Sequence, residues 1–376
     1  MEPFTFTANP SRVIFGAGCI SQLPVELQRL DKSAALVLST PGQAKLADIV
    51  LTTLGSSTVG KFTEATMHTP IHVTEKGLAH AIEVKADSIV SIGGGSTIGL
   101  GKAISIRTGL PHICIPTTYV ILSSISRSSK LINCHDSYAG SEMTPILGET
   151  VDGVKTTRSD PKILPATVIY DVDFTMTLPA AISSTSGVNA IAHAVEALYA
   201  KNTNPVISLL ALDGIKSLAA SLPVIVDSPQ DKDSRLKAFY GAWLCGLCLG
   251  SVGMSLHHKL CHTLGGTFNL PHANVHTIVL PHALAYNSPE IPEVMKALAG
   301  VFPDSNGDAI QGLNALLTKL KVERGLAAFG MKDGDVDKAA DIAVKNAYWN
   351  PRKIERDSIR ELIRRAWAGD QASADL

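Results

Sequence analysis

The sequence is short of the features that mark membrane, nucleic-acid-binding or secreted proteins. Lys and Arg number 33 against 34 Asp and Glu, a formal charge of −1, so no long-range field recruits nucleic acid or an anionic membrane. No apolar run reaches the roughly 18 residues that span a bilayer. Met1–Arg12 lacks the basic start and apolar stretch of a secretory signal. We therefore expect a soluble, cytoplasmic protein that binds neither membranes nor nucleic acid.

Cysteine is also scarce, with six in 376 residues. Six thiols in a chain of this length do not form a dense disulfide framework. Cys245 and Cys248 stand three positions apart, but no second pair with that spacing completes a zinc site. We expect ordinary reduced, packed thiols.

What the chain does have is 45% hydrophobic residues and room for two domains. Its first half alternates helical stretches, such as Ile20–Leu30 and Ile71–Val84, with short apolar runs of strand length. Those runs are Arg12–Phe15, Ala34–Leu38, Asp87–Ile92, His112–Ile115 and Ala166–Tyr170. Alternation of this kind predicts a parallel sheet covered on both faces.

The strand signal disappears from about Leu178 onward. The remaining sequence is typical of long helices, for example Ser186–Tyr199, Val206–Ala220, Ser234–Leu264 and Asp357–Ala368. We therefore predict a Rossmann-like α/β dinucleotide-binding domain over residues 1–178 and an all-helical domain over residues 179–376. The cleft between two such domains is the natural ligand site.

A glycine-rich segment, Gly93–Lys102, directly follows the predicted strand Asp87–Ile92. Glycines there let the backbone approach a diphosphate, and the next helix points its N–H groups and positive dipole end at the anion. We predict that Gly94, Gly95 and Ser96 bind cofactor phosphates. The strand Ala34–Leu38 runs into Ser39, which we predict to contact the cofactor. The acidic residue that normally holds the NAD ribose is absent there, so NADPH is not excluded.

Polar residues with helical spacing interrupt the apolar second half. Asn189 and His193 are four apart, His258 and His262 are four apart, and His272 follows across a short loop. Residues four apart share one helix face, so we expect these five groups to line a common cleft. His257, His276 and His282 are interpreted as surface or packing residues.

These motifs together resemble the iron-containing alcohol dehydrogenase superfamily, with its dehydroquinate synthase-like fold. The resemblance runs over nearly the whole chain, from Arg12–Gly16 to Asn350–Arg352. The matching motifs are Gly93–Ser96, Pro116–Thr118, Asn189 with His193, His258 with His262, and Pro271-His272. The resemblance implies that Thr117, Thr118 and Lys155 contact a nicotinamide cofactor and that His262 lies beside the nicotinamide. It also implies that the protein is a homodimer.

One position departs from the superfamily pattern. Metal-dependent members hold iron or zinc with Asp, His, His and His, and the matching residues here are Asn189, His193, His258 and His272. A neutral amide is a poor replacement for an anionic ligand. We predict function without metal; any metal that does bind would use His193, His258 and His272.

The departure agrees with one subgroup. Thr185–Ala197, Leu256–Gly266, Pro281–Asn287 and Ala139–Pro145 resemble maleylacetate reductases, which reduce the carbon–carbon double bond of maleylacetate to give 3-oxoadipate in aromatic-compound catabolism. Hydride addition to a conjugated alkene needs a hydrogen-bond donor and a proton source in place of a Lewis acid.

For this reaction we predict that the substrate is a small dicarboxylate. His193, His258 and His272, beside Asn189, would form a polar substrate cradle of neutral or protonated imidazoles, and His262 would donate the proton. Two alternatives stay open. One is a metal-dependent alcohol or glycerol dehydrogenase of the same superfamily, and the other is a catalytically impaired nucleotide-binding relative.

The segment Val120–Tyr138 has no counterpart in the family pattern, which runs from Pro-Thr-Thr-Tyr almost directly into Ala-Gly-Ser-Glu. Removing it restores that pattern. We favour its being a translated intron of a eukaryotic gene over a genuine lid or specificity loop. Because it adjoins the cofactor threonines, it would reduce activity if it is present in the working protein.

Overall fold

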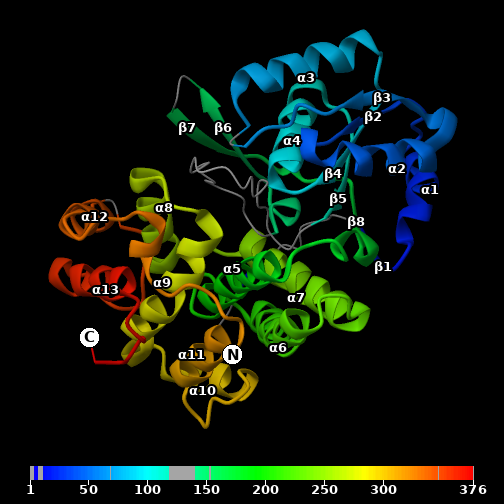
Figure 1. The fold of residues 1–376 in the computed structure, drawn as a ribbon. Coiled ribbons are helices and arrows are strands. Elements are labelled where there is room, and N and C mark those ends of the chain that lie inside the picture. The colour runs from blue at the N-terminus through cyan, green and yellow to red at the C-terminus, as the bar shows by residue number, and fades with distance from the viewer. Residues whose placement is uncertain are drawn as a thin grey trace. The chain divides into compact units, whose positions relative to one another are not determined.

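In the computed structural model the chain forms two compact units, each with its own core (Figure 1). One unit holds residues 12–117 and 140–178; the other holds residues 179–375, with residues 4–6 grouped with it. The structure describes residues 4–6, 12–67, 69–117, 140–151, 154–345 and 347–375.

The first unit is built on a six-stranded parallel sheet with the strand order β1-β8-β5-β4-β2-β3. The strands are β1 (Arg12–Gly16), β2 (Ala35–Leu38), β3 (Thr58–Phe62), β4 (Ser88–Gly93), β5 (His112–Pro116) and β8 (Thr167–Asp171). Five of them coincide with the predicted apolar runs. The predicted fold class is therefore confirmed.

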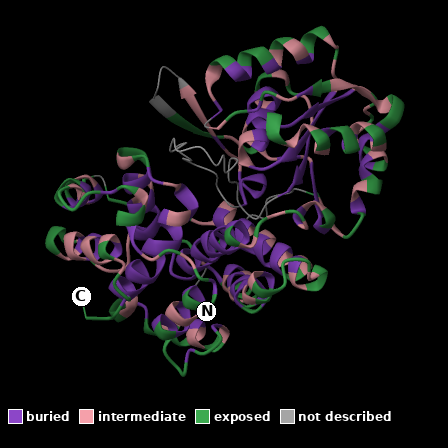
Figure 2. Cartoon of the chain, in the orientation of Figure 1, coloured by how far each residue is buried: buried purple, intermediate pink, exposed green. Residues whose placement is uncertain are grey.

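Helices cover both faces of this sheet. Successive side chains of a strand point to opposite faces, so Ala35 and Val37 join the core under α1 (Leu23–Arg29) and α2 (Ala44–Leu54). Leu36 and Leu38 join the core under α3 (Ile71–Glu83) and α4 (Gly95–Thr108). Burial on both faces explains why these strands are continuous apolar runs, and Figure 2 shows them in the colour of buried residues.

Three strands were not predicted. The edge strand β3 reads Thr-Val-Gly-Lys-Phe, and only Phe62 is buried. The hairpin of β6 (Ile146–Val151) and β7 (Val154–Ser159) forms a separate two-stranded antiparallel sheet. Polar, partly exposed strands pair through their backbones without an apolar run, so periodicity does not reveal them.

The second unit contains helices and no strand among its described residues. They are α5 (Ala180–Leu198), α6 (Pro205–Asp227), α7 (Lys232–Ser251), α8 (Leu256–Phe268), α9 (His272–Asn287), α10 (Pro292–Val301), α11 (Ala309–Lys319), α12 (Asp335–Val344) and α13 (Arg356–Ala368). Nearly every residue of α5 from Ile182 onward is buried. Helix α5 is therefore the central helix of this unit, and it carries Asn189, His193 and Glu196.

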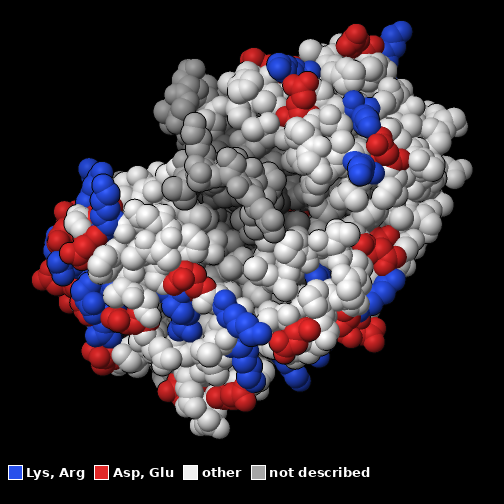
Figure 3. Space-filling view, in the orientation of Figure 1, with Lys and Arg blue, Asp and Glu red and all other residues white. Residues whose placement is uncertain are grey.

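Helix α6 alone is long and apolar enough to cross a membrane by length and composition, among the residues the structure describes. Half of its most apolar window is buried inside the protein, and it packs against α5 and α7. It therefore has the character of a core helix. On the face drawn in Figure 3 charges of both signs are interspersed, without a large patch of one sign.

The single helix predicted over Ser234–Leu264 is wrong, because the chain breaks it into α7 and α8 at a bend of 96°. Val252 is extended, with φ −135° and ψ 164°. The break lies between Ser251 and Leu256, and Gly253 gives the backbone there additional freedom. The break leaves the N-terminus of α8 without N–H acceptors from a preceding helical turn, and a distant carboxylate caps it.

Candidate active site

The sheet has one topological switch point, at the carboxyl ends of β2 and β4. The chain leaves β2 for β3 on one side and leaves β4 for β5 on the other. Ligands of open α/β sheets bind at such a point, outside the carboxyl ends of the strands. Ser39 directly follows β2, and Gly93–Gly95 joins β4 to α4. The topology thus brings together residues predicted separately from the sequence.

The glycine loop is tightly fitted. Gly93 has φ +147°, and a Cβ there would lie 2.7 Å from both Gln43 Oε1 and Thr97 Oγ1. Gly94 is the N-cap of α4, which begins at Gly95, so the first turn and the positive end of the helix dipole sit at the switch point. Only glycine allows this close approach at position 93.

Gln43 ties the loop to the neighbouring strand. Its Nε2 donates to Thr117 Oγ1 at 2.9 Å, and its Oε1 accepts from Thr40 at 3.2 Å. Thr117 follows β5, and its N–H donates to Gly93 O at 3.1 Å. Gln43 was not predicted, because a lone glutamine after a strand carries no sequence signal.

Three other predicted cofactor residues remain, and only Ser39 among them has a side chain that the structure describes. Ser39 is fully buried and its N–H donates to Phe62 O at 3.0 Å. Thr118 lies outside the described residues, as does the segment Val120–Tyr138. Lys155 belongs to strand β7, and its side chain is outside the described part.

Lys102, which ends the glycine-rich motif, points inward. Its Nζ donates to the carbonyl oxygens of Ser141 (2.6 Å), Thr144 (2.9 Å) and Ile146 (2.9 Å). Burial lowers its pKa to about 8. A lysine with its donors used in this way anchors the segment before β6 and takes no part in binding phosphate.

Six histidines gather around α5, α8 and α9 in the helical unit. His193 Nδ1 and His258 Nε2 are 2.8 Å apart. The ring centroids lie 6.1 Å apart for His258 and His262, and 4.1 Å apart for His272 and His276. His276 also lies 6.0 Å from His193 and 5.0 Å from His258. The predicted histidines are therefore neighbours, joined through one that was interpreted as packing.

The default interpretation of three histidines is corrected in part. His276 and His257 are fully buried members of the cluster, 4.9 Å apart between ring centroids. His282 is buried as well, though outside the cluster contacts. None of the three is a surface residue. His257 adjoins His258 on α8, and His276 lies four positions after His272 on α9.

Glu196 organises the cluster. It is fully buried on α5, and its carboxylate accepts the N–H groups of Ser255 (2.8 Å) and His257 (2.6 Å) at the start of α8. Ser255 itself makes no side-chain cap, so Glu196 caps α8 from a distance and meets its positive dipole end.

Glu196 also fixes the tautomers of two histidines. Its Oε2 lies 2.7 Å from His258 Nδ1, and a carboxylate only accepts, so His258 Nδ1 donates. His258 Nε2 then accepts from His193 Nδ1, leaving a lone pair on His193 Nε2. That atom and both amide atoms of Asn189 are buried and have no hydrogen-bond partner among the described residues.

Burial favours the neutral form of four histidines in the cluster. Burial, reinforced by the neighbouring imidazoles, holds the pKa values of His193, His258 and His276 well below their usual range, and that of His257 falls to about 4. The idea of a cationic cradle is therefore wrong for His193 and His258. Six imidazoles in one buried space disfavour any positive charge there.

With this geometry in place, the comparisons with known proteins decide the family. A family model described as "Iron-containing alcohol dehydrogenase" matches residues 10–172. A second, described as "Fe-containing alcohol dehydrogenase family, C-terminal", matches residues 183–367. The chain belongs to the iron-containing alcohol dehydrogenase family.

Within this family the similar proteins are maleylacetate reductases. The maleylacetate reductase of Burkholderia cepacia is 48% identical over 373 residues, which cover 99% of this chain and all of the relative. That of Rhizobium sp. strain MTP-10005 is 46% identical over 369 residues, 98% of this chain and 99% of the relative. The crystal structure of maleylacetate reductase from Agrobacterium tumefaciens has a TM-score of 0.91 at 47% identity, covering 99% of this chain and 100% of that chain.

Membership of the iron-containing alcohol dehydrogenase family identifies a nicotinamide nucleotide as the cofactor. The parts that fit it are the switch point and the glycine loop of the first unit. The family name also implies iron, so the donor set at the matching positions has to be tested.

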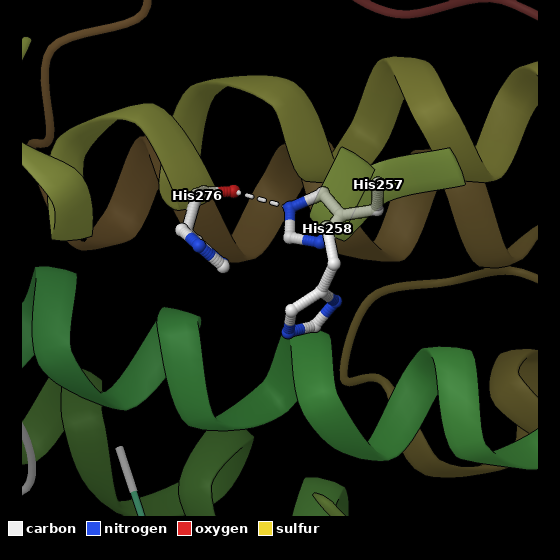
Figure 4. Close-up of side chains that lie close together, drawn as sticks. All are labelled: His257, His258 and His276. Carbon is white, nitrogen blue, oxygen red and sulfur yellow. Dashed lines mark hydrogen bonds between the residues drawn. The ribbon is translucent and has the colours of Figure 1, made fainter. Parts of the chain in front are cut away.

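At these positions the described side chains differ from the family's donor set at Asn189, and some of them are bonded to one another. Both ring nitrogens of His258 are engaged, with Glu196 and His193, and Asn189 offers an amide where the family has a carboxylate. His257, His258 and His276 do bring ring nitrogens within 4.8 Å of one another. Figure 4 shows, however, that the His258 ring points towards α5, while His257 Nε2 is hydrogen-bonded to His276 O. Ring nitrogens of His257 and His258 are thus already engaged in hydrogen bonds.

His262 stands at the edge of the cluster and is only partly buried. Its Nδ1 lies 3.2 Å from the hydroxyl of Tyr348. Neither Tyr348 nor Glu196 was predicted as a site residue. Glu196 could have been found, because it extends Asn189 and His193 into a polar stripe with helical spacing in an otherwise apolar helix; Tyr348 has no such signal.

Proposed function

We propose that the chain catalyses the NADH- or NADPH-dependent reduction of the carbon–carbon double bond of maleylacetate to 3-oxoadipate. Relatives named maleylacetate reductase are 44–48% identical over nearly the full chain. The observation that carries the proposal is the family metal position itself, where the amide of Asn189 stands in place of the family's carboxylate, beside the neutral, mutually hydrogen-bonded imidazoles of His193 and His258.

This donor set suits a conjugated alkene. The bound cofactor supplies a hydride to one alkene carbon. Charge then spreads into the adjoining carbonyl as an enolate, and the other carbon gains a proton. Hydrogen-bond donors can stabilise the enolate, so no Lewis acid is required at the oxygen. A buried polar group without a partner costs about 1–3 kcal/mol, so Asn189 gains most by meeting a polar group of the substrate.

We assign the substrate-binding role to Asn189, His193, His258 and His272, and the proton-donating role to His262. Asn189 and His193 share one face of α5, and a neutral amide removes the repulsion that an aspartate would exert on a dicarboxylate. His262 differs from the others in being partly exposed and bonded to a phenol, so it can exchange protons with water.

For the cofactor, we propose that Gly94, Gly95 and Ser96 hold the phosphates at the first turn of α4, and that Thr117, Thr118 and Lys155 contact the nucleotide. The chain after β2 begins with Ser39 and Thr40. With no carboxylate there to repel a 2′-phosphate, NADPH is accepted as well as NADH. We further propose a metal-independent, cytoplasmic homodimer.

The test is the stoichiometry of the reaction. Purified protein is given maleylacetate with NADH or NADPH, nucleotide oxidation is followed by absorbance, and the product is identified by mass spectrometry. One 3-oxoadipate per nucleotide is expected, and His262→Ala should lose turnover while still binding nucleotide. Full turnover by His262→Ala would remove His262 from its role. Oxidation of simple alcohols, and only with added metal, would favour a metal-dependent alcohol dehydrogenase.

A further inference from the structure

Tyr348 lies in the segment between α12 and α13 and reaches back to α8. Its hydroxyl is 3.2 Å from His262 Nδ1, and the two rings meet edge to face with centroids 6.3 Å apart. Lys259, almost one turn before His262 on α8, holds its Nζ 5.7 Å from the centroid of the Tyr348 ring. Tyr348 is 39% exposed. The phenol therefore touches both His262 and solvent.

A neutral imidazole has a difficulty as a proton donor. It carries one ring hydrogen, and giving that hydrogen away leaves an imidazolate unless the other nitrogen gains a proton at the same time. A donor aimed at Nδ1 removes this difficulty. Burial raises the pKa of Tyr348 above its usual 10, so the phenol keeps its hydrogen at neutral pH and is able to donate it to Nδ1 when His262 is in the tautomer that leaves Nδ1 bare. His262 then carries its own hydrogen on Nε2.

We propose that Tyr348 is the source of the proton that His262 delivers to the substrate. The inference rests on the proposed function. As the hydride and its two electrons reach one alkene carbon, the bond between His262 Nε2 and its hydrogen breaks and a bond from that hydrogen to the substrate forms. At the same time the O–H bond of Tyr348 breaks and its proton joins Nδ1. His262 ends as the other neutral tautomer.

The tyrosinate that results is short-lived and regains a proton from water, and His262 returns to its starting tautomer when Nδ1 gives up its proton to water and Nε2 takes one from water. Its exposure gives water access, and the ammonium of Lys259 lies near the ring while negative charge is present. Nicotinamide oxidation, substrate protonation and return of the proton from water then balance. The reaction consumes one hydride and one proton.

Tyr348→Phe tests the relay, because it removes only the hydroxyl and leaves the ring. The matched control is Tyr240→Phe, which removes a hydroxyl that donates to Asp213 at 2.8 Å elsewhere in the same unit. General acid catalysis contributes about 10²- to 10⁴-fold, so kcat of Tyr348→Phe should fall by about that factor. The KM for maleylacetate, the Kd for nucleotide and the free energy of unfolding should stay near those of the wild type.

A second readout separates proton delivery from simple orientation of the ring. In Tyr348→Phe the solvent deuterium isotope effect on kcat should rise, because protonation becomes the slow step, whereas Tyr240→Phe should match the wild type. A kcat within threefold of the wild type, or a change confined to KM, would overturn the relay. A wild-type protein that is inactive, and stays inactive when Val120–Tyr138 is deleted, would instead overturn the proposed function, so the two failures are distinct.

Discussion

Replacing Gly93 with Ala perturbs the phosphate loop at a single atom. Gly93 has φ +147° at the end of β4, a conformation that side chains rarely adopt, and the new Cβ would lie 2.7 Å from Gln43 Oε1 and from Thr97 Oγ1. Gly16 is a matched control. It ends β1 of the same sheet with φ +150°, and a Cβ there meets nothing within 4 Å.

The two substitutions share one penalty and differ in another. Backbone strain in this region costs about 1–3 kcal/mol at either position. At position 93 the contact must also displace Gln43, which is bonded to Thr40 and Thr117. Each lost hydrogen bond adds about 0.5–1.5 kcal/mol. Gly93→Ala should therefore lose about 2–6 kcal/mol of unfolding free energy, against about 1–3 kcal/mol for Gly16→Ala.

The functional difference is the sharper one. If the loop holds the cofactor diphosphate, Gly93→Ala should weaken NADPH binding by tenfold or more, since about 1.4 kcal/mol corresponds to a factor of ten. Gly16→Ala should bind NADPH as the wild type does. Fluorescence titration gives the Kd values, and urea unfolding gives the stabilities. Equal Kd values for all three proteins would refute the placement of the cofactor at this loop.

Three further predictions concern other parts of the molecule. Glu196→Gln leaves one acceptor for three donors, so urea unfolding should show a loss of about 1.5–3 kcal/mol; an unchanged stability would deny that Glu196 caps α8. Burial lowers the pKa of His112 to about 3 from 6.5, so as pH falls from 6.5 towards 3 the unfolded chain binds its proton first and stability is lost. His112→Asn should flatten the dependence of unfolding free energy on pH between pH 4 and 6 by about 1.4 kcal/mol per pH unit, and parallel curves would contradict this. Deleting Val120–Tyr138 should raise kcat for maleylacetate, whereas a loss of activity would identify the segment as a functional loop.

Much of the first unit could be predicted because buried parallel strands are apolar on both faces. Ala35–Leu38 contributes alternate side chains to two separate cores, and this burial is what makes the run visible. The edge strand β3 has no such requirement, since its pairing with β2 uses backbone groups and the Thr58 hydroxyl, which donates to Ala35 O. It therefore leaves no periodic signal in the sequence.

The helical unit shows a different limit. Four-residue spacing placed His193, His258 and His262 correctly on helix faces, because that spacing is local. The cluster's connections are not local: Glu196 reaches Ser255 and His258 across about 60 positions, and Tyr348 reaches His262 across 86. His276 and His257 were interpreted as packing for the same reason, since burial beside other histidines depends on how α8 and α9 pack. Local spacing along the chain does not reveal contacts between residues that lie so far apart in the sequence.

The central claim is that the reduction of maleylacetate proceeds without metal. The most direct measurement is turnover of maleylacetate with NADH and with NADPH after exhaustive chelation, with bound iron and zinc determined on the same sample by mass spectrometry. We predict full turnover with far less than one metal ion per chain. Activity that disappears on chelation and returns with iron or zinc would contradict the neutral, metal-free site built from Asn189, His193 and His258.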